Sequence, residues 1–215
     1  MNKTLIKICG ITTAELAEQA AIAGANYIGI VFHPDSPRYV NVKQAKAIAT
    51  AAKQHGAQPV AIFTHHTAQV MQQICDEAGI NIVQLHGTIA RKEHALLPST
   101  FKRIYVHPIT ESGSFLTIND DSISNCDKSR DFLLFDSMTP GQGKMFNWKN
   151  FNYGGCFSWF LAGGLTCNNV GKAIELLHPT AVDVSSGVEK KPGEKDINVI
   201  TKFIFAVKNP ALEVR

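Results

Sequence analysis

The feature that most constrains the fold is a repeated alternation between short apolar runs and alanine-rich stretches with helical spacing. Each apolar run is rich in β-branched and aromatic residues and ends in a polar or glycine-containing turn. Parallel strands need a crossover connection, and a helix is the usual one, so this alternation predicts a parallel sheet covered by helices. We expect eight strands, at residues 5–9, 27–32, 59–63, 80–85, 102–106, 132–135, 159–162 and 181–184.

Helical spacing is evident between most of these runs. Thr12, Thr67 and Asn168 are plausible N-caps, because their side-chain oxygens can accept hydrogen bonds from the first backbone N–H groups of a helix. Two connections lack a clear pattern: residues 112–128 are rich in Ser and Asp, and residues 147–157 are too few for a long helix. We expect helices at about 13–24, 43–55, 67–78, 90–97, 168–177 and 195–208.

Eight strand–helix units in 215 residues indicate a closed (β/α)8 TIM barrel of class α/β, with about 27 residues in each unit. An open doubly wound sheet is the alternative. Such a sheet usually has fewer strands and carries a G-x-G-x-x-G turn after the first one, which Cys9-Gly10-Ile11-Thr12 does not match. We therefore expect a single barrel domain over residues 1–215.

Composition argues against several classes of partner. The charged fraction is 18%, the formal net charge is +3, and Lys and Arg are scattered, so a nucleic-acid partner is not expected. No apolar run approaches the roughly 20 residues that span a bilayer, and residues 1–4 begin no signal peptide, so we expect a cytoplasmic protein without a membrane partner. The five cysteines form no C-x-x-C pair, which indicates neither a disulfide framework nor a zinc site.

The turns after the last two predicted strands indicate a phosphate site. Gly163 and Gly164 expose backbone N–H groups, and a helix starting nearby directs its positive end toward an anion. Ser185, Ser186 and Gly187 add hydroxyl groups and further exposed backbone. These turns are the usual phosphate site of a (β/α)8 barrel, so a small phosphorylated substrate is expected. A Gly-Gly pair can also make only a tight turn, but two such turns in succession favour phosphate.

Two reactive side chains end strands that face each other across the predicted barrel. A carboxylic acid at Asp136 can donate a proton and a thiolate at Cys9 can remove one, which makes them candidates for general acid–base catalysis. Cys9 can also be a small buried apolar residue, and a substrate phosphate nearby opposes formation of its thiolate. The residue types alone leave both interpretations open.

Other polar residues near the strand ends are candidate substrate contacts. Arg38, on the long turn after the second strand, can pair with a substrate carboxylate, although a solvated loop arginine is the simpler interpretation. His86 and Asp183 can orient a substrate or can be satisfied structural groups. His65 and His66 lack partners at metal-ligand spacing and are expected at the surface.

Six segments occur in a fixed order along the chain: KICGIT at 7–12, SPRYV at 36–40, QLHG at 84–87, LAGGLT at 161–166 followed by Asn169-Val170, VDVSSGVE at 182–189, and Gly193 with Lys195-Asp196. Together they resemble the motif set of the phosphoribosylanthranilate isomerase family of tryptophan biosynthesis. The resemblance extends over nearly the whole chain, and the order and separation of the segments make it specific although each segment is short. It implies the same (β/α)8 fold as the alternation pattern.

The resemblance implies an Amadori rearrangement of N-(5-phosphoribosyl)anthranilate to 1-(2-carboxyphenylamino)-1-deoxyribulose 5-phosphate, without a cofactor or metal. Asp136 matches the family's general acid, which protonates the ring oxygen so that the sugar opens to a Schiff base. Cys9 matches the general base that removes the C2 proton, and Arg38 matches the residue that contacts the anthranilate carboxylate. The backbone at 163–164 and 186–187 matches the phosphate site. The family also implies a monomer or a homodimer at this length.

Three departures from the family pattern concern the outer parts of the site. Family members commonly have an aromatic residue in place of His33, and a Val-Asn pair in place of Thr64-His65. The loop after Asp136 usually contains a Gly-Gly-Thr-Gly or Gly-Gly-Ser-Gly run, whereas residues 140–145 read PGQGKM here. The departures remove no proposed catalytic residue and concern the shape of the anthranilate pocket and of this loop.

Other functions fit parts of the pattern. An indole-glycerol-phosphate synthase shares the phosphate site but needs a lysine acid near a strand end and usually an extra N-terminal segment, and neither is evident. A non-catalytic phosphometabolite-binding protein needs neither Cys9 nor Asp136. A thiol hydrolase needs a histidine close to Cys9, for which His86 is the only plausible candidate, and no thiol-protease signature surrounds the thiol. The isomerase is the expected function.

Overall fold

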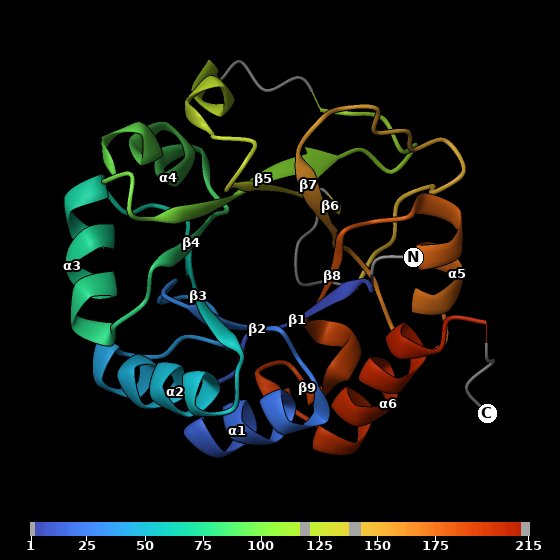
Figure 1. The fold of residues 1–215 in the computed structure, drawn as a ribbon, viewed down its shortest axis with the longest axis horizontal. Coiled ribbons are helices and arrows are strands. Elements are labelled where there is room, and N and C mark those ends of the chain that lie inside the picture. The colour runs from blue at the N-terminus through green and yellow to red at the C-terminus, as the bar shows by residue number, and fades with distance from the viewer. Residues whose placement is uncertain (1–2, 117–120, 138–142, 212–215) are drawn as a thin grey trace.

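Eight parallel strands close into a barrel, which is seen end-on in Figure 1. The computed structural model describes residues 3–116, 121–137 and 143–211. Each strand pairs in parallel with the next, and β8 pairs with β1 to complete the ring, so the predicted (β/α)8 fold is confirmed. The strands are β1 Leu5–Cys9, β2 Tyr27–Val31, β3 Gln58–Phe63, β4 Ile82–Leu85, β5 Lys102–Ile109, β6 Phe132–Ser137, β7 Ser158–Leu161 and β8 Ala181–Val184.

Helices surround the barrel on the outside (Figure 1). Thr13 and Thr67 cap α1 and α3, since each hydroxyl accepts a backbone N–H of the first turn. The predicted cap at Thr67 is confirmed, whereas Thr12 and Asn168 were wrong by one residue because α1 and α5 begin one residue later, after Thr13 and Asn169. The described α-helices are α1 Ala14–Ala23, α2 Val42–Gln54, α3 Ala68–Ala78, α4 Thr88–Glu93, α5 Val170–Leu177 and α6 Ile197–Lys208.

The described residues contain no long helix on two sides of the barrel. Between β5 and β6 there is a single described helical turn, η2 Asp121–Asn125, and residues 143–157 before β7 form turns. Ser and Asp side chains compete with a helical backbone for hydrogen bonds, as Asp127 does by accepting the N–H two residues later. Aromatic rings cover β6 instead, where the ring centroids of Phe151 and Phe135 lie 5.2 Å apart.

An antiparallel hairpin between β8 and α6 was not predicted from the sequence. It consists of β9 Glu189–Lys191 and β10 Glu194–Lys195, and it follows the short 3-10 helix η3 Ser186–Val188. Strands this short and charged carry no alternating apolar pattern. The hairpin packs against the long turn after β2, because a Cβ added at Gly193 would lie 2.3 Å from the carbonyl oxygen of Pro37.

Strand side chains alternate between two apolar layers. One layer fills the barrel interior and includes Phe160, which is fully buried. The other lies between the strands and the helices and contains the buried alanines of α1 and α2. Ile6 and Ile8 of β1 belong to this outer layer. Lys7 and Cys9 therefore face the interior, on the way to the C-terminal mouth of the barrel.

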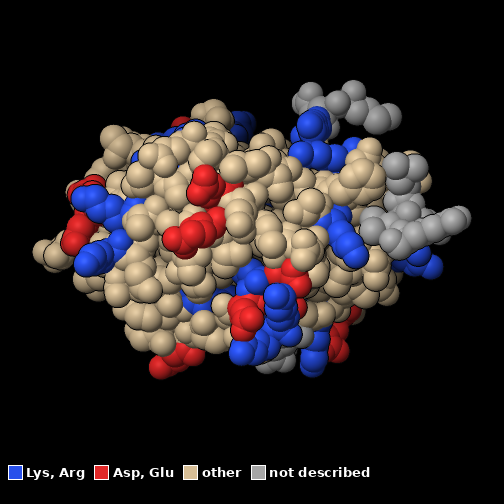
Figure 2. Space-filling model, turned by 90° about the horizontal axis from the view of Figure 1, so that it is seen from below, with Lys and Arg blue, Asp and Glu red and all other residues tan. Residues whose placement is uncertain are grey.

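Charged side chains of both signs are mixed on the face shown in Figure 2. At the surface of the hairpin, for example, the Nζ of Lys191 lies 3.0 Å from Oε2 of Glu194, and both side chains are exposed. Among the helices of the described ranges, none has the length and apolar character needed to cross a membrane.

Candidate active site

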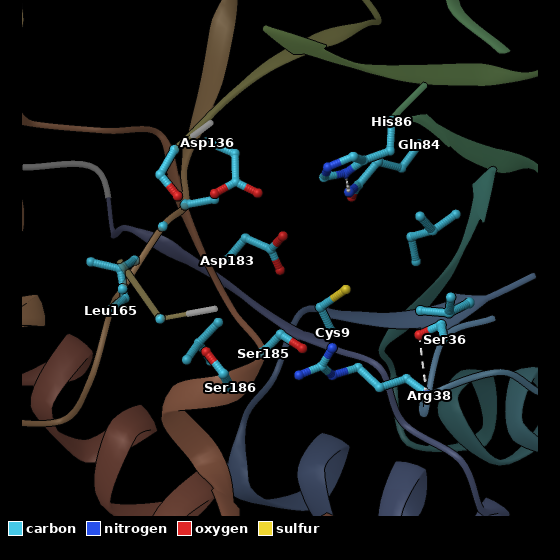
Figure 3. A pocket seen from close by; sticks show the side chains of 18 of the residues that line it. Cys9, Ser36, Arg38, Gln84, His86, Asp136, Leu165, Asp183, Ser185 and Ser186 are labelled. Atoms are coloured by element: carbon cyan, nitrogen blue, oxygen red, sulfur yellow. Dashed lines mark hydrogen bonds between the residues drawn. The ribbon is translucent and has the colours of Figure 1, made fainter. Parts of the chain in front are cut away.

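A pocket of about 210 Å³ lies at the C-terminal mouth of the barrel (Figure 3). It brings together nearly all the residues that the sequence singled out, because the strands that carry them end at the same rim. Gly187 is not among the lining residues but packs against Leu165, which lines the pocket. The singled-out residues that line the pocket are Cys9, Arg38, His86, Asp136, Gly163, Gly164, Asp183 and Ser186.

Asp136 and Cys9 lie on opposite sides of this pocket, with Asp183 between them (Figure 3). Burial, followed by the nearby Asp183 carboxylate, raises the pKa of Asp136 to about 7. Near neutral pH this carboxyl therefore keeps a substantial protonated fraction, which a proton donor needs. Burial also raises the pKa of the Cys9 thiol, while the ammonium groups of Lys7 and Lys195 lower it in part.

Sequence reasoning missed Lys7, a fully buried lysine inside the barrel. Its Nζ donates a hydrogen bond to Oδ1 of Asp183 at 2.9 Å. Burial alone would lower the pKa of Lys7, but Asp183 and then Cys9 raise it above its ordinary value, so the ammonium stays charged. One signal was available, because Lys7 precedes Cys9 by two residues on a strand and therefore points to the same side.

The turns after β7 and β8 form one end of the pocket. Gly163 and Gly164 have φ angles of +89° and +66°, a region that favours glycine, so the backbone turns sharply there. The two turns are in direct contact, since a Cβ added at Gly187 would lie 1.9 Å from the carbonyl oxygen of Leu165. Helix η3 begins at Ser186, immediately after β8. A short helix at this place is a usual part of phosphate sites in (β/α)8 barrels.

Arg38 is not the solvated loop residue of the simpler interpretation. Its Nε and Nη2 donate hydrogen bonds to the carboxylate of Glu189 at 2.7 and 2.8 Å, and its side chain is 13% exposed. Burial raises the pKa of Glu189, but hydrogen bonds from Arg38 and Lys195 outweigh it and hold the pKa below its ordinary value. Sequence reasoning gave Glu189 and Lys195 no role, because an irregular segment gives no spacing from which to infer contact.

His86, which follows β4, is held in its neutral form. Burial, followed by repulsion from Lys7 and Arg91, lowers the pKa of His86 to about 4. Its Nδ1 lies 3.4 Å from the side-chain nitrogen of Gln84. A neutral imidazole has one donor and one acceptor, so His86 can bind a polar group without adding charge to the pocket.

Two of the three departures from the family pattern lie at the pocket. His33 and Thr64 line it, and the ring of His33 lies against that of the exposed His65 at a centroid distance of 5.6 Å. The third departure, in the loop after β6, is described only in part. Residues 138–142 lie outside the described residues, whereas Gly143 lines the pocket.

Residues 3–116, 121–137 and 143–211 hold no group of three or more His, Cys, Asp or Glu side chains that could bind a metal ion. His65 and His66 belong to no such group in this part of the chain. His65 is exposed as expected, while His66 is partly buried beside the ring of Phe63.

Comparison with known proteins identifies the family. Residues 6–206 match the family model described as "PRAI: N-(5'phosphoribosyl)anthranilate (PRA) isomerase". The chain belongs to the PRA isomerase family. A PRA isomerase from Chlamydia caviae is 37% identical over 204 residues, which cover 94% of this chain and 96% of the relative. The resemblance seen in the sequence motifs is therefore confirmed.

Solved structures of PRA isomerases have the same barrel. A structure of mutually generated monomers of the dimeric enzyme from Thermotoga maritima has a TM-score of 0.74 at 28% identity, covering 95% of this chain and 98% of the other. A PRA isomerase in complex with reduced 1-(o-carboxyphenylamino)-1-deoxyribulose 5-phosphate has a TM-score of 0.70 at 29% identity, with the same coverage. At least one PRA isomerase thus holds a phosphorylated ligand in this fold.

Proposed function

We propose that the chain isomerises N-(5-phosphoribosyl)anthranilate to 1-(2-carboxyphenylamino)-1-deoxyribulose 5-phosphate, a step of tryptophan biosynthesis. Asp136 is the general acid and Cys9 the general base. The observation that carries this assignment is a carboxyl with a pKa of about 7 across a single pocket from a thiol. Membership of the PRA isomerase family supports the overall reaction.

In the first step Asp136 protonates the ring oxygen of the sugar. The bond from this oxygen to C1 breaks, its electron pair stays on oxygen, and the anthranilate nitrogen forms a protonated Schiff base at C1. An acid with a pKa near the working pH is suited to this transfer. Lys7 lies close enough to Asp136 to lower the pKa of its carboxyl, so it stabilises the carboxylate that forms.

In the second step the Cys9 thiolate removes the proton from C2. The electrons of that C–H bond form the C1–C2 double bond, and the nitrogen takes up the electron pair of the imine, which gives an enolamine. The protonated imine makes this C–H bond more acidic, so a base present in small amount is sufficient. Lys7 and Lys195 favour the thiolate over the thiol.

The enolamine then becomes the ketone, as the C2 hydroxyl loses a proton and C1 gains one. C1 is thereby reduced and C2 oxidised within one molecule. The enzyme is therefore an intramolecular oxidoreductase of the aldose–ketose type, and this scheme uses no external oxidant, metal or cofactor.

The remaining site residues hold the substrate in this proposal. Arg38 binds the anthranilate carboxylate through the guanidinium donors that Glu189 leaves open. The backbone at 163–164 and 186–187 binds the phosphate at the other end. Asp183, which lies between the acid and the base, and His86, which lies at the side of the pocket beside Gln84, orient the sugar.

The proposal is tested by following anthranilate fluorescence after adding purified protein to freshly prepared N-(5-phosphoribosyl)anthranilate. We expect a rapid loss that depends on protein concentration, well above the slow change in a sample with heat-denatured protein. No loss with folded protein would contradict the isomerase assignment. It would favour instead another phosphate-binding barrel enzyme or a non-catalytic phosphometabolite-binding protein.

A further inference from the structure

The β9–β10 hairpin carries two members of a buried ion-pair network, Glu189 and Lys195, and the reaction scheme assigns no task to Glu189. The carboxylate of Glu189 accepts hydrogen bonds from Arg38 and, at 2.7 Å, from the Nζ of Lys195. The side chains of Glu189 and Lys195 are 4% and 0% exposed. Charges taken out of water are costly unless they stay paired, so these three side chains have little freedom to separate.

Lys195 extends this network of ion pairs toward the phosphate end of the pocket. Its Nζ donates hydrogen bonds to the carbonyl oxygen and the hydroxyl of Ser185, at 3.0 and 3.2 Å. Ser185 lines the pocket beside Ser186 (Figure 3). The hairpin also packs against Pro37, the neighbour of Arg38. A single chain of charged hydrogen bonds therefore joins the turn after β2 to the turn after β8.

Arg38 keeps donors for a ligand in this arrangement. A guanidinium has five N–H donors in one plane, and Glu189 takes one on Nε and one on Nη2. The donors that remain, on Nη1 and Nη2, form the end of the fork, which can hold a second carboxylate. Arg38 and Lys195 are both positive and share the single negative charge of Glu189. The three side chains together therefore carry one net positive charge, which favours a second carboxylate. Figure 3 shows the guanidinium extending toward Ser185, below Cys9.

We propose that Glu189 is a positioning residue, which holds Arg38 in the orientation that binds the substrate carboxylate. The inference rests on the proposed function, because it takes Arg38 as the carboxylate ligand. Glu189 acts only through Arg38 and stays out of contact with the substrate. Loss of its charge leaves Arg38 facing Lys195 without an anion between them, so the guanidinium turns away from its binding orientation.

The test compares Glu189→Gln with Glu194→Gln, the same change on the same hairpin. Glu194 is 51% exposed and forms a surface ion pair with Lys191, away from Arg38, so it is the matched control. For N-(5-phosphoribosyl)anthranilate we expect Glu189→Gln to raise KM about tenfold or more while kcat changes less than about threefold. Glu194→Gln should leave both constants unchanged. Thermal unfolding of each variant checks that it is folded.

A second substrate separates positioning from general damage to the site. N-(5-phosphoribosyl)aniline is the same molecule without the carboxylate, so Arg38 has nothing to bind there. Glu189→Gln should then change KM for the analogue by less than about twofold relative to wild type. An equal rise in KM for both substrates would overturn the inference. If Glu189→Gln does not fold, Glu189→Asp takes its place, because it keeps the charge but withdraws the carboxylate by one methylene.

Arg38→Met distinguishes failure of this inference from failure of the proposed function. If Arg38→Met raises KM for the natural substrate and Glu189→Gln does not, the inference is overturned and the proposed function stands. If Arg38→Met leaves KM unchanged, both the carboxylate contact and the inference are wrong. The double variant should be no weaker than Arg38→Met alone, because Glu189 then has no residue to act through. An inactive wild-type protein would contradict the proposed function itself.

Discussion

The roles proposed for Asp136 and Cys9 require opposite ionisation states within one pocket, a neutral carboxyl and an ionised thiol. Burial and the Asp183 carboxylate favour the neutral form of Asp136, which is the form that donates a proton. Burial also favours the neutral form of Cys9, although the role proposed for it requires the thiolate. In the proposed mechanism the active enzyme is therefore the fraction in which Asp136 is protonated and Cys9 is ionised. Lys7, which donates a hydrogen bond to Asp183, increases the thiolate fraction of Cys9.

This pairing predicts a characteristic dependence of kcat/KM on pH. Below about pH 7, where Asp136 is protonated, activity should rise with pH as the thiolate fraction grows. From about 7 upward the loss of the Asp136 proton offsets further ionisation of Cys9, so the rate levels off, and it falls once the thiol is fully ionised. In Asp136→Asn the residual activity should keep rising above pH 7. An unchanged bend near pH 7 in that variant would contradict the assignment of the acid.

The turns after β7 and β8 act as one element, because their backbones touch. Gly187 has no room for a side chain beside Leu165, and Gly163 and Gly164 turn the chain in a conformation that glycine favours. A rigid pair of turns can hold backbone N–H groups in place for a phosphate without reorganisation on binding.

Gly187→Ala should therefore weaken phosphate binding. The new methyl group pushes the two turns apart, and we expect KM to rise about tenfold or more, with weaker inhibition by inorganic phosphate. Gly154→Ala is the control, because a Cβ at this exposed glycine meets no atom within 4 Å. The measurement compares the KM values of the Gly187→Ala and Gly154→Ala variants, each determined on folded protein. A Gly187→Ala enzyme with wild-type KM and phosphate inhibition would rule out this role for the turns.

The strand–helix alternation was sufficient to predict the barrel and the strand ends that form the site. Cys9 and Asp136 could be found because strand ends in this fold converge on one rim. Glu189 and Lys195 could not, since the contacts of Glu189 with Arg38 and with Lys195 depend on a hairpin that has no sequence pattern. The connections at 112–128 and 147–157 gave no clear helical pattern in the sequence for a related reason. Asp127 and Phe151 use local hydrogen bonds and ring packing there in place of helical periodicity.

At the scale of the whole molecule, the barrel interior holds charged side chains away from water, and burying a charge lowers the stability of the fold. Lys7 and Asp183 form an ion pair inside it, and Asp136 lies within the electrostatic reach of both. Such groups serve chemistry at the expense of stability. We propose that residues 1–215 form a single domain, so this cost should appear in one cooperative unfolding transition.

Asp136→Asn should stabilise the protein at alkaline pH. The pKa of Asp136 rises from 3.8 to about 7 on folding, so the folded state binds the proton more tightly and stability falls as pH rises between these values. Removing the ionisable group should therefore gain about 2.5 kcal/mol more in the free energy of unfolding at pH 8 than at pH 5. Urea denaturation of wild type and Asp136→Asn at both pH values measures this difference in the free energy of unfolding. An equal effect at both would show that folding does not perturb this carboxyl.

The most direct test of the acid–base pair is turnover of freshly prepared N-(5-phosphoribosyl)anthranilate by wild type, Cys9→Ala and Asp136→Ala. We expect kcat to fall by about 10²- to 10⁴-fold in each variant, the usual contribution of a positioned acid or base. Affinity for reduced 1-(o-carboxyphenylamino)-1-deoxyribulose 5-phosphate should stay within about threefold of wild type, because neither residue is assigned to ligand binding. A folded variant of either kind with near wild-type kcat would show that Cys9 and Asp136 are not the catalytic base and acid.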